Sequence, residues 1–387
     1  MAALLLGGAM APVFAADVKN LSVTVSSGTQ ANAYGGYTIE EGASALQNAL
    51  TLSGPAKVLG ASAGGWSRWG NAEWNTLTIR LDEDGLLGPS DIVGGGVAES
   101  EGGGAAVHNT VYIESGTVEG TVEGGVAVGI NGVGDGTGDV LSNQVTMSGG
   151  TVYSVFGGET GEGNANDNVV TIKGSAAVTG KSNAVYGGYT IDGNASGNIV
   201  NIEDDADIHG EIMGGYTRAG SLISGNKVNV TGGNVNENTV YGVYTAYGDV
   251  LDNQAVIKGT GQAGSSDTNS VYAGFTNIGA AAGNILYIQD SAEIAGSAFA
   301  GYQGGFISSE TVERNQVFMS GGSVGGDLTG GGSNNGGETL NNYVEITGGT
   351  VSGNVYSGFT DSADALENTL TVAGGRVEGS LFGGYSN

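Results

Sequence analysis

The chain has 387 residues, of which 77 are glycine, three are proline and none is cysteine. Lysine and arginine (11) against aspartate and glutamate (39) give a net charge of -28, which disfavours binding to nucleic acid or to an anionic bilayer. The lack of cysteine excludes disulfides, zinc-thiolate sites and a cysteine nucleophile, whereas 39% hydrophobic residues argue against low-complexity disorder.

The N-terminus has the layout of a secretory signal. An apolar segment, 2–11, is followed by Pro12 and by the small residues Val13 and Ala15. This pattern predicts a signal over 1–15, cut after Ala15, and therefore export. The positively charged N-terminal region of such a signal is missing. This indicates that Met1 lies inside a longer signal or that the start of the sequence is misassigned. The alternative is a buried first strand.

After the signal, an aromatic-Gly-Gly-aromatic block recurs along the chain, as in "VYGGYT" at 185–190. Its copies are 26 to 33 residues apart, with a mean of about 29, a period typical of solenoid repeats. Some copies keep the glycines without the second aromatic. The last block residues are Tyr37, Trp66, Val97, Val126, Glu159, Tyr189, Tyr216, Tyr244, Phe275, Tyr302, Gly331, Phe359 and Tyr385.

A second pattern, Asn-x-aliphatic-x-aliphatic, runs in phase with the first. Its copies begin at Asn48, Asn75, Asn109, Asn143, Asn168, Asn198, Asn226, Asn253, Asn284, Asn315, Asn342 and Asn368. Alternation with period two predicts a strand with one buried face. We expect the asparagines to stack as an internal ladder at a turn, beside a continuous core. Its central members are Val145, Met147, Val170, Ile172, Val200 and Ile202, whereas residues such as Thr76 and Gln144 face outward.

Glycine pairs after these strands predict sharp bends with positive φ. They stand at Gly149-Gly150, Gly232-Gly233, Gly321-Gly322, Gly348-Gly349 and Gly374-Gly375. A second short strand is expected next, for example over Thr350 to Val355.

In "VYGGYT", the glycines are expected to form a corner, and the aromatics to stack on equivalent rings of neighbouring coils. The alternative is an exposed aromatic row that stacks on sugar rings. The stretch between this motif and the next asparagine varies in length, as partner-binding loops of solenoids do.

Together these patterns predict an all-β chain: a right-handed parallel β-helix, or solenoid, of about 13 coils with about 29 residues per coil. Stacking is required because one such unit is too short to form a core alone. Helices are disfavoured, because no apolar period of 3.6 is sustained and frequent glycine destabilises a helix.

The acidic, cysteine-free, Gly- and Asn-rich repeats from about Val18 to Asn387 resemble the β-helical passenger of a bacterial autotransporter (type V secretion) adhesin. This resemblance implies export and display at the bacterial cell surface, with the outer membrane reached through a C-terminal barrel. We expect a signal over 1–15 and a passenger over 16–387 that is incomplete at its C-terminus, because "LFGGYSN" ends within a repeat.

Residues suited to catalysis or metal binding are few. His108 and His209 are about three and a half coils apart, which argues against a shared catalytic site. The acidic clusters 82–84 and 203–207 have the residue types of a glycosidase or calcium site but are expected to be solvated loops. The glycine-Asp run 132–139 occurs once, whereas calcium-binding repeats of this kind occur in tandem. The sequence therefore assigns no catalytic, cofactor-binding or metal-binding residue.

The expected function is that of a non-catalytic, surface-displayed passenger in adhesion or self-association. Its partner would be a host or bacterial surface protein or glycan, or another copy of the chain. A polysaccharide-active β-helix enzyme and a structural spacer rod are the alternatives.

Overall fold

The computed structural model describes residues 16–89, 92–99, 103–129, 135–181, 184–236, 238–264, 269–305, 310–334 and 336–387. The predicted signal, 1–15, and residues 132–134 of the glycine-Asp run lie outside these ranges. The described residues form strands and turns without an α-helix, so none of them belongs to a helix that could cross a membrane.

Each coil of the described chain passes through up to four strand positions. The corner strands are β1 (Val18–Lys19), β5 (Ala45–Leu46), β9 (Ala72–Glu73), β13 (Ala106–Val107), β16 (Val140–Leu141), β19 (Ala165–Asn166), β26 (Leu222–Ser224), β30 (Asp249–Leu251), β34 (Ala281–Ala282), β38 (Val312–Glu313), β41 (Thr339–Leu340) and β44 (Ala365–Leu366). The Asn strands follow as β2 (Ser22–Val25), β6 (Ala49–Gly54), β10 (Thr76–Leu81), β14 (Thr110–Ser115), β17 (Gln144–Met147), β20 (Val169–Ile172), β23 (Ile199–Ile202), β27 (Lys227–Val230), β31 (Gln254–Ile257), β35 (Ile285–Ile288), β39 (Gln316–Val324), β42 (Tyr343–Val351) and β45 (Thr369–Val372).

The third position holds short bridging strands, which in some coils are continuous with a neighbouring strand. Separate ones are β3 (Thr29–Gln30), β7 (Lys57–Val58), β11 (Leu86–Leu87), β21 (Ala177–Val178), β24 (Asp207–Ile208), β28 (Asn234–Asn236), β32 (Gln262–Gly264), β36 (Glu293–Ile294) and β46 (Arg376–Val377). The Gly-Gly strands complete each coil as β4 (Ala33–Thr38), β8 (Ser62–Ser67), β12 (Val93–Glu99), β15 (Thr117–Val128), β18 (Thr151–Thr160), β22 (Val185–Thr190), β25 (Ile212–Thr217), β29 (Val240–Tyr247), β33 (Asn269–Ile278), β37 (Ser297–Gln303), β40 (Leu328–Ser333), β43 (Val355–Thr360) and β47 (Leu381–Ser386).

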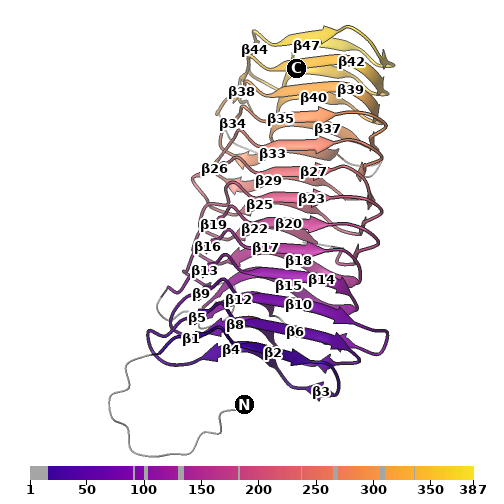
Figure 1. Cartoon of the computed structure of the whole chain (residues 1–387). Coiled ribbons are helices and arrows are strands. Elements are labelled where there is room, and N and C mark those ends of the chain that lie inside the picture. The colour runs from indigo at the N-terminus through magenta and orange to yellow at the C-terminus, as the bar shows by residue number, and fades with distance from the viewer. Residues whose placement is uncertain are drawn as a thin grey trace, which may run out of the picture.

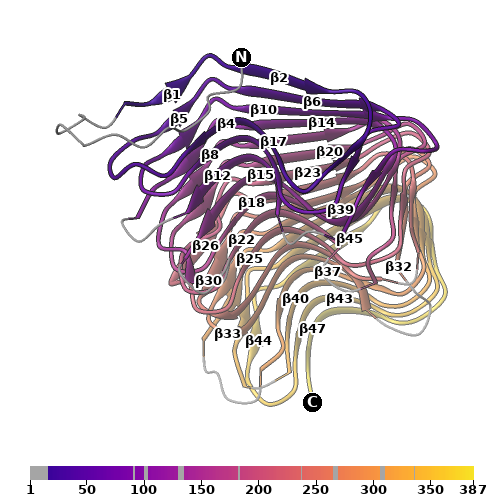
Figure 2. The same cartoon turned by 90° about the horizontal axis from the view of Figure 1, so that it is seen from below.

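The coils stack as a parallel β-solenoid. Every pairing between described strands is parallel and joins equivalent positions of successive coils, as where Val170 of β20 pairs with Val200 of β23. In Figure 1 the tiers rise from the first described coils to the last, and Figure 2 shows each coil slightly offset from the one before it. The predicted fold class, a parallel solenoid, is confirmed.

The core is a column of aliphatic side chains from the Asn strands. Val145, Met147, Val170, Ile172, Val200 and Ile202 are at most 1% exposed. The outward-facing Gln144 is exposed and Thr76 is half-buried, as the alternation predicts. The assignment of faces from the sequence is therefore confirmed for these strands.

The asparagines form the predicted ladder. In each of its steps, the backbone N and Nδ2 of one asparagine both donate to Oδ1 of the next; Asn168 reaches Asn198 in this way at 2.9 and 3.1 Å. Nδ2 also donates to a corner-strand carbonyl, as Asn168 does to Val140 at 3.0 Å. These bonds satisfy the buried amide completely, which removes the cost of burying it.

The backbone confirms one predicted detail and corrects another. The second glycine of each predicted bend has positive φ, between 72° at Gly233 and 89° at Gly349. The strand expected over Thr350 to Val355 is instead divided, because β42 ends at Val351 and β43 begins at Val355.

The Gly-Gly pair is not a corner, contrary to the prediction. Both glycines lie within a strand, and neither has positive φ in "VYGGYT". A Cβ on Gly188 would lie 2.5 Å from Nδ2 of Asn198, and one on Gly187 would lie 2.3 Å from the carbonyl oxygen of Gly214. Glycine is required here because the strand lies directly against the asparagine ladder and the next coil.

Candidate functional site

Two columns of rings run along the outer face of the Gly-Gly strands. The aromatics of one motif, such as Tyr186 and Tyr189, lie on the same side of the strand, with ring centroids 5.4 Å apart and nearly perpendicular planes. Between coils, the second-position rings from Tyr189 to Phe275 lie almost parallel. Tyr216 is 4.9 Å from Tyr189 and 5.7 Å from Tyr244, at interplanar angles of 8° and 4°. The predicted stacking of equivalent rings is confirmed.

The stacked columns leave little ring surface for a ligand. First-position side chains such as Tyr186 and Tyr272 are 1% and 4% exposed, and the second-position Tyr189 and Tyr216 are half-buried. Burial raises the pKa of Tyr189 to about 12 and also raises the pKa of Tyr216. Because ring faces meet other rings, this surface is better suited to joining coils than to stacking on sugars.

The columns are interrupted where the motif has lost its aromatics. Gly332 pairs with Tyr302 and Phe359, so it, and not Gly331, occupies the second aromatic position of that coil. The ring of Tyr302 covers Gly332, where a Cβ would lie 2.9 Å from Cδ2 of the tyrosine. Burial raises the pKa of Tyr302 to about 12, with a further contribution from Asp361 two coils away.

Two glutamates replace aromatics at the N-terminal end of the longest ring stack. Glu123 pairs in register with Phe156 and is 1% exposed, and Glu159 pairs with Tyr189 in the next coil and is half-buried. Burial raises the pKa of Glu159 to about 8. The sequence shows the lost aromatic at Glu159 but not that Glu123 stands in register with Phe156, because neighbours are known only once the register is known.

The hydroxyl that ends the motif points inward. Thr160, Thr190 and Thr217 are 0% exposed, and each donates a 2.8 Å hydrogen bond to a glycine carbonyl of the preceding coil: Gly138, Gly163 and Gly193, respectively. This threonine therefore joins the end of its Gly-Gly strand to the loop that follows the Gly-Gly strand of the preceding coil. The role was not predicted, although the repeated hydroxyl was visible in the sequence.

The acidic clusters and histidines lie in turns or beside them, with Asp207 at the start of β24. Asp204 has φ of 57° and its Oδ2 accepts a hydrogen bond from Gly174 N of the neighbouring coil at 3.1 Å, whereas Oδ1 of Asp82 accepts one from Asp84 N at 3.0 Å. His108 stacks on Trp74 with centroids 4.2 Å apart, and the exposed His209 contacts Asp207 at 2.8 Å. Asp82 and Asp204 therefore have a structural role in these turns. In the described residues, no cluster of His, Asp or Glu could hold a metal ion.

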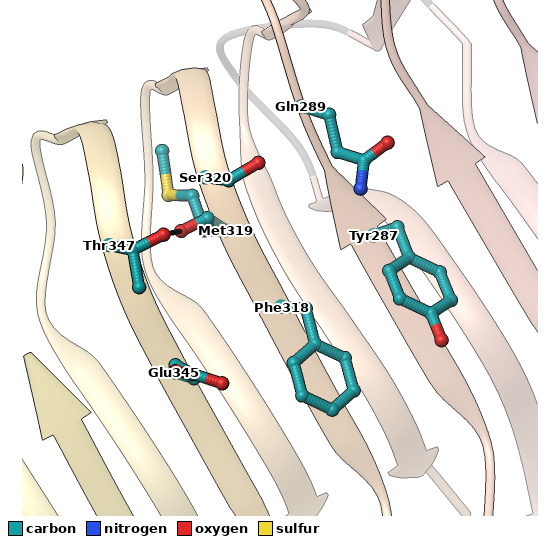
Figure 3. A pocket seen from close by; sticks show the side chains of 7 residues that line it. All are labelled: Tyr287, Gln289, Phe318, Met319, Ser320, Glu345 and Thr347. Atoms are coloured by element: carbon teal, nitrogen blue, oxygen red, sulfur yellow. Dashed lines mark hydrogen bonds between the residues drawn. The ribbon is translucent and has the colours of Figure 1, made fainter.

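A second aromatic surface lies on the outer face of the Asn strands. Tyr287 of β35 and Phe318 of β39 have centroids 5.4 Å apart at an interplanar angle of 18°, and Tyr343 of β42 lies 5.9 Å from Phe318. Figure 3 shows the rings of Tyr287 and Phe318 side by side, with their faces turned toward the viewer. They line a shallow cavity of about 240 Å³ together with Gln289, Met319, Ser320, Glu345 and Thr347.

Comparison of the chain with models of protein families, with curated proteins and with solved structures finds no match. The assignment of function therefore depends on the geometry described above and on the motif resemblance.

Proposed function

We propose that the chain is the exported, non-catalytic passenger of an autotransporter-type system, displayed at the bacterial cell surface for adhesion or self-association. The observation that carries the proposal is the continuous parallel pairing of thirteen Gly-Gly strands in the described residues, from β4 to β47. Such a stack presents a long lateral surface on which many weak contacts can add up.

The placement of polar side chains supports the same proposal. The buried asparagines bond one another, the motif threonines bond the backbone, and Asp204 bonds a turn of the neighbouring coil. These side chains hold the rod together, and the surface left for a partner is the outward face of successive strands. A partner would be a surface protein or glycan, or a second copy of the rod.

A polysaccharide-active enzyme is the second candidate, favoured by Glu123 and Glu159. Glu123 is buried and Glu159 has a raised pKa, and carboxyl groups with such properties act in glycoside hydrolysis. The neighbouring Phe156 and Tyr186 are buried, so a sugar ring would have to displace packed side chains to reach the pair.

The test uses the full-length protein displayed on bacterial cells. Removal of residues 198–252 deletes two coils in register, because Gly197 is then followed by Asn253 in place of Asn198. We expect a folded rod with weaker cell adhesion or aggregation. The comparison variant carries Glu123→Gln and Glu159→Gln, which we expect to leave adhesion unchanged.

Release of sugars from polysaccharides is measured in parallel. Adhesion that is unaffected by the deletion, together with sugar release that the two Gln substitutions abolish, would overturn the passenger assignment in favour of the enzyme.

A further inference from the structure

The outer face of the Asn strands is mostly polar, and the aromatic cluster at Tyr287 departs from it. At the third position after each asparagine, most coils carry a threonine or an asparagine: Thr51, Thr78, Thr146, Thr171, Asn201, Asn229 and Thr371. Two successive coils instead carry Tyr287 and Phe318, and Tyr343 of the next coil lies beside Phe318. Neither core packing nor the coil register requires aromatic residues at these outward positions.

Half-buried rings occur in both places, and the cavity distinguishes this patch from the columns on the Gly-Gly strands. There, rings such as Tyr216 are enclosed by rings above and below. Here the cavity reaches both Tyr287 and Phe318, and the side chain that follows Phe318 in register is Glu345, not another ring. The outer surface of two neighbouring rings is therefore open to a ligand (Figure 3).

We propose that the patch formed by Tyr287, Phe318 and Tyr343 binds a neutral saccharide chain. A sugar ring presents an apolar C–H face that packs on an aromatic ring and hydroxyl groups at its edge that need hydrogen-bond partners. Glu345, Gln289, Ser320 and Thr347 supply these partners around the cavity. This inference rests on the proposed function, because it names the ligand class of the displayed rod.

Charge and size select this class of ligand. The net charge of -28 and the carboxylate of Glu345 repel acidic polysaccharides and nucleic acids. A cavity of about 240 Å³ matches a small ligand segment, whereas a stable protein interface needs a much larger contact area. Polar side chains repeat at the strand spacing of about 4.8 Å, so successive sugars of an extended chain can meet successive coils.

The experiment is affinity electrophoresis of the full chain in native gels that contain hydroxyethylcellulose, xyloglucan or galactomannan. We expect at least one of these neutral polymers to retard the protein, and alginate, which is acidic, to leave its mobility unchanged. Tyr287→Ala or Phe318→Ala should weaken the apparent affinity about tenfold. The matched control is Tyr112→Ala, at the same position of β14, where the side chain is 43% exposed.

The inference is overturned if none of the three neutral polymers retards the chain, or if Phe318→Ala and Tyr112→Ala have equal effects. The 198–252 deletion leaves the patch intact and should retain polymer binding. Cell adhesion without polymer retardation would refute the saccharide site alone. Polymer retardation that Phe318→Ala weakens, without any cell adhesion or aggregation, would refute the proposed function alone.

Discussion

At each corner before an Asn strand, one asparagine makes the hydrogen bonds that the bend leaves open. The residue before it has a left-handed conformation, with φ of 58° at Asp167 and 55° at Asp252, or is a glycine such as Gly197 with φ of 68°. Non-glycine residues in this conformation cost about 1–2 kcal/mol each. The paired bonds along the ladder offset that cost in every coil.

Asn168→Ala should lower the free energy of unfolding by about 2 to 5 kcal/mol, because Asn143 N and Nδ2 lose their acceptor in a buried site. The control is Asn201→Ala, which removes a half-buried amide that bonds Thr171 on the outer face. Its effect should stay below about 1 kcal/mol. Urea unfolding measures both, and equal losses would contradict the internal ladder.

Glu159 should make the rod less stable as the pH rises. Its pKa is about 8 in the folded chain against 4.5 for the free group, so the folded chain binds this proton more tightly than the unfolded chain does. The stability that this proton contributes is fully present below about pH 4.5 and is lost as the pH rises to about 8. Glu159→Gln should flatten the fall in melting temperature between pH 5 and 8.

The control for this titration is Glu162→Gln, at an exposed position in the following turn. Melting temperatures at four pH values give the slope for each variant. If Glu162→Gln changes this slope as much as Glu159→Gln does, then general charge repulsion, and not burial of Glu159, sets the pH dependence.

Among the elements, the Asn strands were predictable, and the Gly-Gly strands only in part. The alternation of apolar and polar residues predicts that Val170 and Ile172 are buried, because alternate residues of a strand lie on opposite faces. Gly187 and Gly188 predict a corner because glycine usually marks positive φ, whereas here glycine avoids a clash with Asn198. A clash between residues on different strands cannot be seen without the coil cross-section.

The corner strands were missed although the sequence contains a signal for them. A small or branched residue stands three positions before every asparagine of the ladder, as Ala45, Val140 and Ile223 do, and these side chains are 0% exposed. The stretch resembles a variable loop because its length changes on the N-terminal side of that residue. Its fixed spacing to the asparagine is what predicts a buried strand.

The candidate saccharide site could not be predicted from local sequence. Tyr287, Phe318 and Tyr343 are 25 or more residues apart in the chain and each sits in an ordinary outward position. Only the register of β35, β39 and β42 brings the rings together.

The ring columns couple neighbouring Gly-Gly strands. Tyr216→Ala removes a ring that packs between Tyr189 and Tyr244, so the free energy of unfolding should fall by about 2 kcal/mol. Tyr247→Ala is the control, because this tyrosine is 55% exposed and should contribute less than about 0.5 kcal/mol. The stacking is contradicted if the two urea midpoints shift equally.

At the scale of the whole molecule, contacts join each coil to the coils next to it. Stability is then close to a sum over coils and their interfaces, and damage at one coil stays partly local. The net charge of -28 opposes this compaction but discourages aggregation. The central claim is that equivalent residues of successive coils lie directly side by side.

Disulfide cross-linking tests this register most directly, because the chain has no cysteine of its own. Thr171 and Asn201 are paired across neighbouring coils, and Asn229 is paired with Asn201 one coil further on. Thr171→Cys with Asn201→Cys places the two Cα atoms about 4.8 Å apart, within reach of a disulfide. Thr171→Cys with Asn229→Cys places them about 10 Å apart, beyond that reach. After mild oxidation, mass spectrometry should detect the intramolecular cross-link in the first variant and not in the second. A cross-link in the second variant alone, or in neither, would contradict the solenoid register.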